Sequence, residues 1–160
     1  MEKANAILQH PFYIECLEKI TEYEKDRIFC GHDMTHFLDV ARLAYLFSLE
    51  EDLGIEKEHI YAAALLHDIG RHVQYRDNTP HQKAGVPIAD NILIDCGFQE
   101  DERRMILTAI IRHRDSTVQG EKNLAGLIYR ADKMSRSCFG CPAESQCNWS
   151  TEKKNMVLKY

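Results

Sequence analysis

The segment from about residue 56 to residue 70 constrains the fold most, because its second half is almost entirely apolar and then ends in a histidine and an aspartate. Apolar side chains on every side of a helix indicate that the helix is buried at the centre of a domain. A charged carboxylate at the end of such a helix costs free energy unless it is paired, hydrogen-bonded or bound to a metal. His67 and Asp68 therefore predict a polar site inside the protein, at the end of its central helix.

Other segments have the apolar spacing of amphipathic helices and would pack around this central helix. They cover about residues 11–29, 33–49, 81–96, 99–112 and 123–136, and Asp33 is a suitable N-cap for the second of them. Residues 71–80 are polar and predict a loop, and Pro87 should kink or divide the helix that contains it. No segment alternates between polar and apolar residues with period two. We therefore expect an all-α fold, a single compact bundle of five to six or more helices.

Composition limits the partners that we expect. A chain of 160 residues with 44% hydrophobic residues is one ordinary globular domain. Its formal net charge of -5 gives no general basic surface, so we expect no nucleic acid polymer as a partner, and an anionic substrate would need a local positive site. A bound metal ion could supply that site. The sequence gives no indication of the oligomeric state.

The N-terminal residues carry no apolar core of signal-peptide length, and no window approaches the roughly 18 apolar residues of a membrane-spanning helix. We therefore expect a cytoplasmic protein that makes no contact with a membrane. In that compartment, the six cysteines are expected to be free thiols or metal ligands and not disulfides.

Histidine and aspartate residues recur near the ends of the predicted helices. They are His36, His67, Asp68, His81, His113 and Asp132. Imidazole and carboxylate ligands without thiolates suit Fe, Mn, Co, Ni or Zn and argue against a structural zinc finger. Adjacent helical residues point about 100° apart, so His67 and Asp68 could bind one ion only from a helix end, where Gly70 would permit the chain to bend. His32 precedes its helix, and we do not expect it among the ligands.

Order, spacing and local sequence at these positions resemble a known family. His36, the pair His67-Asp68, and Asp132 are similar to the H…HD…D signature of the HD superfamily of metal-dependent phosphohydrolases, and the sequence around each of them agrees. The resemblance covers about residues 30–136. It implies an HD domain in residues 1–136 with its core at about 30–136, followed by a tail of residues 137–160.

His81 and His113 extend the resemblance to HD proteins that bind two metal ions through an H…HD…H…H…D pattern. The similarity is closest to small bacterial HD hydrolases that cleave diadenosine tetraphosphate symmetrically, in which residues 81–85 and 109–113 have counterparts. This resemblance implies two divalent ions, with iron or manganese favoured over the other metals named above. One ion would be bound by His36, His67 and Asp132 and the other by His81 and His113, with Asp68 bridging them.

The resemblance implies a hydrolase of a phosphate ester or anhydride, acting on a small phosphorylated molecule such as a nucleotide or dinucleotide. A hydroxide that bridges the two ions would attack phosphorus, and Asp68 would hold the ions in place. We expect cationic side chains to stabilise the charge that develops in the transition state, and we assign this role to Arg71, Lys83 and Arg112.

Two alternatives remain open. Some HD-fold proteins use the same six-ligand pattern to hold two irons and activate oxygen, as the inositol oxygenases and a phosphonate-cleaving oxygenase do. The ligands alone do not separate such a di-iron oxygenase from a hydrolase. A non-catalytic binding module for a metal or another ligand is the third possibility, but the intact ligand set disfavours it.

The C-terminal tail carries a second pattern, outside the HD resemblance. Cys138, Cys141 and Cys147 follow the spacing C-x2-C-x5-C beside glycine and proline, which resembles part of a zinc or iron–sulfur site. A fourth ligand is missing locally, and Cys16, Cys30, Cys96 or another chain could supply it. The alternative is a tail of reduced thiols that packs on the domain.

Overall fold

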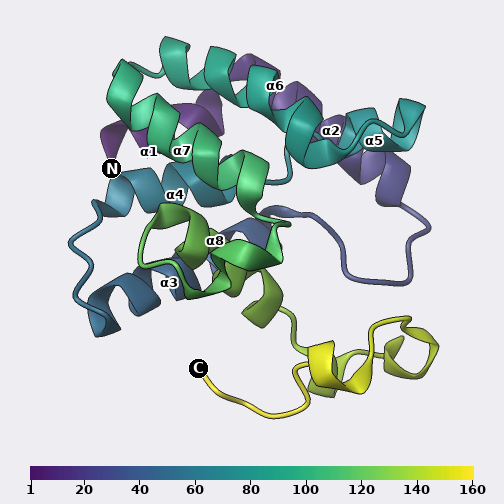
Figure 1. Cartoon of the computed structure of the whole chain (residues 1–160). Coiled ribbons are helices and arrows are strands. Elements are labelled where there is room, and N and C mark those ends of the chain that lie inside the picture. Colours follow the sequence, from purple (N-terminus) through teal and green to yellow (C-terminus); the bar gives the residue numbers. More distant parts are fainter.

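The computed structural model describes residues 1–160 and contains only helices and irregular segments (Figure 1). The α-helices are α1 (Glu2–Gln9), α2 (Pro11–Glu24), α3 (Met34–Glu50), α4 (Lys57–Leu66), α5 (Arg71–Asp77), α6 (His81–Asp95), α7 (Glu100–Arg112) and α8 (Leu124–Met134). Short 3₁₀ turns are η1 (Ser116–Gly120), η2 (Cys138–Gly140), η3 (Glu144–Gln146) and η4 (Thr151–Lys153). The all-α prediction is confirmed.

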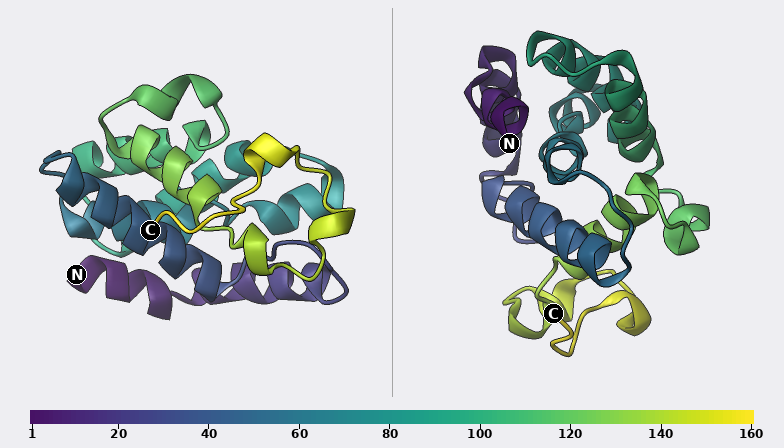
Figure 2. Two further views of the ribbon diagram at one scale, coloured as in Figure 1. Left: turned by 90° about the horizontal axis from the view of Figure 1, so that it is seen from below. Right: turned by 90° about the vertical axis from the view of Figure 1, so that its left-hand side faces the viewer.

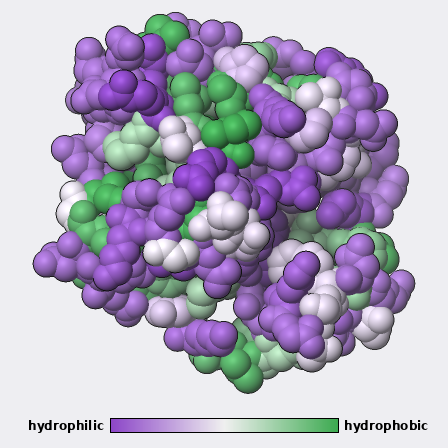
Figure 3. Space-filling view, in the orientation of Figure 1, coloured by the Kyte–Doolittle hydropathy of each residue, from purple (hydrophilic) through white to green (hydrophobic).

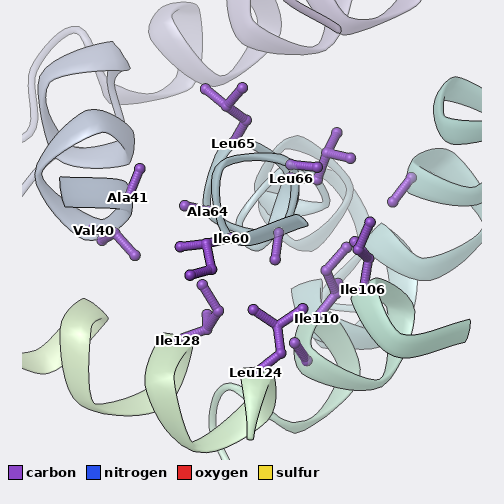
Figure 4. Close-up of a cluster of buried hydrophobic side chains, with 14 of the residues drawn as sticks. Val40, Ala41, Ile60, Ala64, Leu65, Leu66, Ile106, Ile110, Leu124 and Ile128 are labelled. Carbon is purple, nitrogen blue, oxygen red and sulfur yellow. The ribbon is translucent and has the colours of Figure 1, made fainter. Parts of the chain in front are cut away.

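Helix α4 lies at the centre of the bundle, as its apolar sequence predicts. Figure 4 shows it end-on, with α3, α7 and α8 around it. Ile60, Leu65 and Leu66 are almost fully buried in the core. Burial of a side chain of this size stabilises the fold by about 1.5–3 kcal/mol, so the core fixes the position of the residues that follow α4.

Capping residues mark where several helices begin. The Asp33 carboxylate accepts a hydrogen bond from the backbone N–H of His36 at 2.9 Å, which confirms the predicted N-cap of α3. Asn123 caps α8 in the same way, through the N–H of Gly126 at 3.0 Å. These caps fix the starting points of two helices that carry predicted metal ligands.

The structure differs from the sequence prediction at two segments. Residues 71–80 are not one loop, because α5 occupies Arg71–Asp77 and ends at Asn78, which adopts the left-handed conformation with φ 64°. Helix α5 packs on α2 and α6 and buries His72, so tertiary contacts stabilise a helix that its polar sequence does not predict. Helix α1 was also not predicted; it packs on α4 through Ala4 and Ile7.

Pro87 lies inside α6 without dividing it into two helices. After α8 the chain contains no further α-helix, and residues 137–160 form the turns η2 to η4 below the bundle (Figure 2). None of the helices combines the length and the apolar character that crossing a membrane requires.

Candidate metal centre

The six predicted ligands come from separate helices and meet beyond the C-terminal end of α4. They are His36 in the first turn of α3, His67 and Asp68 directly after α4, His81 at the start of α6, His113 directly after α7, and Asp132 near the end of α8. All six are buried, and none is more than 8% exposed. The fold thus brings together every residue of the predicted ligand set.

The ligand atoms form two groups that share one residue. His36, His67, Asp68 and Asp132 make the first group, and Asp68, His81 and His113 make the second. Within each group, one ligand atom from every residue lies within 4.8 Å of the others. Each group is close enough to surround one ion.

The two carboxylate oxygens of Asp68 face different histidines. Oδ1 lies 3.0 Å from Nε2 of His81 and 3.6 Å from Nε2 of His113. Oδ2 lies 3.2 Å from Nε2 of His67 and 3.8 Å from Nε2 of His36. One oxygen is therefore available to each group, which is the geometry that a bridging carboxylate requires.

Hydrogen bonds on the far side of three rings fix their tautomers. Nδ1 of His67 and Nδ1 of His113 each donate to a backbone carbonyl of the preceding turn at 2.7 Å, and Nδ1 of His81 donates to the Gln74 side-chain oxygen at 2.5 Å. A neutral imidazole carries only one N–H, so each Nε2 presents a lone pair to the site. Such outer contacts are typical of metal-bound histidines.

The Nε2 lone pairs of these rings face groups that cannot donate a hydrogen bond to them. Nε2 of His67 is buried without any hydrogen bond, although carboxylate oxygens lie beside it. The Nε2 atoms of His81 and His113 lie 3.0 Å apart, and both are directed toward Asp68. A cation between these groups would remove the repulsion. The donor set therefore fits divalent metal ions.

At neutral pH, two of the imidazoles and both carboxylates have the protonation states of metal ligands. Burial lowers the pKa of His36 and that of His81 to about 4, so both rings are neutral. Burial alone would raise the pKa of Asp68, but His67 and Arg71 hold it well below its ordinary value. Burial would likewise raise the pKa of Asp132, but His36 and Lys133 hold it well below its ordinary value. Two ionised carboxylates and the neutral rings of His36 and His81 can bind metal without losing protons. Burial lowers the pKa of His67, but the neighbouring Asp68 and Asp132 carboxylates outweigh it and raise this pKa, so a metal ion at its Nε2 competes with a proton.

Three cationic side chains surround this centre. Arg71 donates through Nε to Oδ1 of Asp68 at 3.0 Å, and Nζ of Lys133 lies 2.5 Å from Oδ2 of Asp132. Arg136 donates through Nη2 to Nε2 of His36 at 3.0 Å and through Nη1 to the carbonyl of Gly31 at 2.8 Å. A metal ion on His36 would take the lone pair that Arg136 now uses.

The predicted phosphate-binding cations are only partly brought to the centre. Arg71 contacts it, whereas Arg112 pairs with Asp115 and Glu121 at 3.3 and 2.9 Å. Lys83 lines an open groove of about 590 Å³ between α6 and α7, where apolar side chains show on the surface (Figure 3). Neither Lys83 nor Arg112 forms an ion pair or hydrogen bond with the six ligands, and their role stays a prediction.

His32 lies in the centre, contrary to expectation. Its Nε2 is 3.6 Å from Oδ2 of Asp68, and the ring is only 5% exposed. The other side of the ring contacts the Glu24 carboxylate, which also accepts the hydroxyl hydrogen of Tyr75. The loop before α3 folds back onto α2, since the N–H of His32 donates to Glu24 at 2.8 Å. The four-residue spacing to His36 was the available signal.

Gly70 is required for a reason other than the predicted bend. Its φ of -78° is accessible to any residue. A Cβ at this position would lie 2.3 Å from the carbonyl oxygen of His81 and 2.5 Å from the backbone nitrogen of Gly85. The absent side chain allows α6 to approach closely, and this approach places His81 beside Asp68.

Comparisons with known proteins agree with this geometry. The family model described as HD domain matches residues 34–137, more than half of the chain. An uncharacterized protein of Clostridium beijerinckii is 46% identical over the full length of both chains. Ribonuclease Y of Acetivibrio thermocellus is 30% identical over 137 residues, which are 85% of this chain and 23% of the enzyme. Ribonuclease Y 1 of Pediococcus pentosaceus is 29% identical over 70% of this chain and 20% of the enzyme. No solved structure matches.

Proposed function

The chain belongs to the HD-domain family, and we propose that it is a phosphohydrolase that works with two divalent metal ions. The observation that carries this proposal is the pair of ligand groups that share Asp68. In our assignment His36, His67 and Asp132 hold one ion, His81 and His113 hold the other, and Asp68 contacts both. Iron and manganese are the ions that the family resemblance favours, and both accept mixed imidazole and carboxylate ligands.

Metal ions bound there would lower the pKa of water toward neutrality and neutralise phosphate oxygens. The protein's own contribution is to hold charge and exclude bulk water. Two carboxylates balance only half of the charge of two divalent ions, so the occupied centre would attract an anion. Arg71, Lys133 and Arg136 add positive charge around it. Arg71 would bind phosphate while its Nε remains on Asp68.

Within this class, a nucleotide or dinucleotide with a phosphate ester or anhydride bond is the substrate that we propose. Support comes from the sequence resemblance of residues 81–85 and 109–113 to dinucleotide hydrolases. A hollow of about 260 Å³ also adjoins the centre, since Ser135 and Arg136 line it and both contact His36. Arg42 and Lys159 line the same hollow and would favour an anionic ligand.

RNA is the second candidate substrate. The similarity to ribonucleases Y favours it, although this chain spans only about a fifth to a quarter of their length. The net charge of -5 argues against it, because binding of a nucleic acid polymer depends mainly on positive charge along the phosphate backbone.

The test is a substrate panel with protein of measured metal content, supplied with manganese or iron. The panel contains diadenosine tetraphosphate, mononucleotides and a short single-stranded RNA, and oxygen uptake by the reduced iron form is recorded in parallel. We expect hydrolysis of a nucleotide or dinucleotide. Cleavage of RNA alone would favour the second candidate, and oxygen uptake without phosphate release would overturn the hydrolase proposal in favour of an oxygenase.

A matched pair of histidine variants tests the two-ion assignment. His113→Gln should lower the metal content from two ions toward one and reduce hydrolysis by about 100-fold or more, because several kcal/mol of charge stabilisation is lost. His10→Gln is the control, since His10 pairs at 3.1 Å with Asp95 in the last turn of α6, the end opposite to His81. If the His113 variant binds as much metal as the wild type, His113 is not a ligand of the second ion.

A further inference from the structure

The cysteines of the C-terminal tail lie on consecutive turns that fold back on themselves. The N–H of Cys141 donates to the carbonyl of Cys138 at 3.2 Å, and the N–H of Cys147 donates to that of Glu144 at the same distance. All six cysteines of the chain are free thiols. Cys138 is buried, and Cys141 and Cys147 are half-buried.

A fourth cysteine reaches this group from the other end of the chain. Cys30 lies in the loop between α2 and α3, which runs beside the tail (Figures 1 and 2). Arg136 ties the loop to the tail by donating to the carbonyl of Gly31, the residue after Cys30, at 2.8 Å. The half-buried Cys30 is therefore held next to the segment that begins η2.

Electrostatic effects identify the same neighbours. Burial is the main cause that raises the pKa of the Cys30 thiol, and the thiols of Cys141 and Cys138 raise it further. Such effects are appreciable only over short distances. Contacts within the tail hold the segment of Cys147, since Nζ of Lys154 donates to the carbonyl and the side chain of Glu144 at 2.9 and 2.7 Å. The other two cysteines lie elsewhere, one buried in α2 and one at the end of α6.

We propose that Cys30, Cys138, Cys141 and Cys147 bind an iron–sulfur cluster, at a site separate from the two-metal centre. This proposal includes the division of the chain into an HD domain of residues 1–136 and a cofactor-binding tail of residues 137–160. It does not depend on the proposed hydrolytic function.

The sulfur atoms, as they stand, are too far apart to surround a single zinc ion. A tetrahedral zinc site with Zn–S bonds of about 2.3 Å holds its sulfurs about 3.8 Å apart. No three of these cysteines have sulfur atoms within 4.8 Å of one another, whereas the histidine and aspartate groups do meet that limit. In a cubane cluster each thiolate binds a different iron, so the four sulfurs lie farther apart than the ligands of one ion.

The tail also lacks the apolar core that would stabilise it alone. In residues 137–160 only Cys138 and Ala143 are buried, and Phe139 is 52% exposed. A covalent or metal crosslink would stabilise one conformation of a segment with so little apolar burial. Four thiolates from the loop and the tail would provide that crosslink.

The experiment uses the full chain, purified without oxygen and then incubated with ferrous iron, sulfide and a thiol reductant. Acid-labile sulfide, iron, zinc and the visible absorption of iron bound to thiolate sulfur are measured on the desalted protein. Sulfide is decisive, because iron at the histidine and aspartate centre carries none. We expect stoichiometric sulfide in the wild type and in Asp68→Ala, which lacks the shared ligand of the other centre.

Cysteine variants test the ligand set. Cys30→Ser and Cys138→Ser should each lose at least most of the sulfide and the visible absorption, while Cys96→Ser, the control, should keep both. Circular dichroism should show wild-type helix content in all three, because the tail contains no α-helix. Three results would overturn the proposal: wild-type protein without sulfide, zinc bound by the thiolates in its place, or a Cys30 variant with the sulfide content of the control.

Discussion

The candidate metal centre and the C-terminal tail position their polar groups in different ways. In the centre, the donors stand at the ends of helices that pack on the apolar α4, and backbone carbonyls orient His67 and His113. In the tail, cysteines lie on short turns with little buried apolar surface. Folding itself therefore forms the first site, whereas the conformation of the tail would depend on the cluster that we propose for it. The predictions below test this difference.

Loss of Asp68 should have the largest effect. Asp68→Ala removes the ligand shared by both groups, so metal-dependent phosphate release should fall by at least about 10³-fold, which corresponds to about 4 kcal/mol. Helix content measured by circular dichroism should be unchanged, because the core around α4 is intact. Asp101→Ala, an exposed carboxylate on α7, serves as the control. Wild-type activity in the Asp68 variant would refute the assignment of the centre.

Substitution of Gly70 should destabilise the whole bundle. In Gly70→Ala the new Cβ meets backbone atoms of His81 and Gly85 at 2.3 and 2.5 Å, so α6 must shift. We expect the free energy of unfolding to fall by about 2–3 kcal/mol. Gly140→Ala in the tail has open space around it and should change stability by less than about 0.5 kcal/mol. Urea unfolding measures the stability of both variants. Equal losses of unfolding free energy would contradict the difference that we describe between the bundle and the tail.

Protein from which a chelator has removed the metal ions should lose stability in acid, because His36 and His81 in the centre take up protons on unfolding. His36 and His81 have pKa values of about 4 when folded, against 6.5 in the unfolded chain. The unfolded chain therefore binds more protons between these values, and stability falls as the pH drops from about 6.5 to about 4. Urea unfolding at several pH values should show this slope. A variant with both residues changed to glutamine should show a weaker slope, and an equal slope would be evidence against neutral buried rings.

Loss of the Asn155 hydrogen bonds, which attach the tail to the end of α8, should have the smallest effect. The Asn155 side chain donates to the carbonyls of Lys133 and Arg136 at 2.7 and 2.9 Å. Asn155→Ala should weaken the attachment of the tail by about 1–2 kcal/mol, seen as faster hydrogen exchange in residues 137–160. Exchange in α4 should not change. Asn148→Ala, at an exposed position, is the control. Faster exchange throughout the bundle would show that the tail supports the core.

Sequence alone predicted most of the fold because its helices are long and amphipathic. The central position of α4, the N-cap at Asp33 and the order of the helices that carry histidines all follow from local spacing. A buried charge after an apolar helix requires partners, and histidines and aspartates near the ends of the other predicted helices indicated where these partners lie. The full ligand set and its division into two groups came from the resemblance to the HD family.

What the sequence did not reveal depends on contacts between distant segments. The polar α5 is stabilised by packing on α2 and α6, and His32 enters the centre because Glu24 binds the loop before α3. Lys133 and Arg136 follow a predicted ligand on α8, yet only the folded chain shows that they contact Asp132 and His36. Gly70 indicated a turn, while its physical role is the close approach of another helix.

One guanidinium joins the two regions. Arg136 holds the ring of His36 with one nitrogen and the backbone next to Cys30 with another. Arg136 also binds the loop before α3 to the tail. An ion that displaces Arg136 from His36 therefore changes the conformational free energy of the loop and the tail. Such coupling is reciprocal. If a cofactor in the tail alters the position of Arg136 and so changes the metal affinity at His36, the metal changes the affinity of the tail for the cofactor by the same factor.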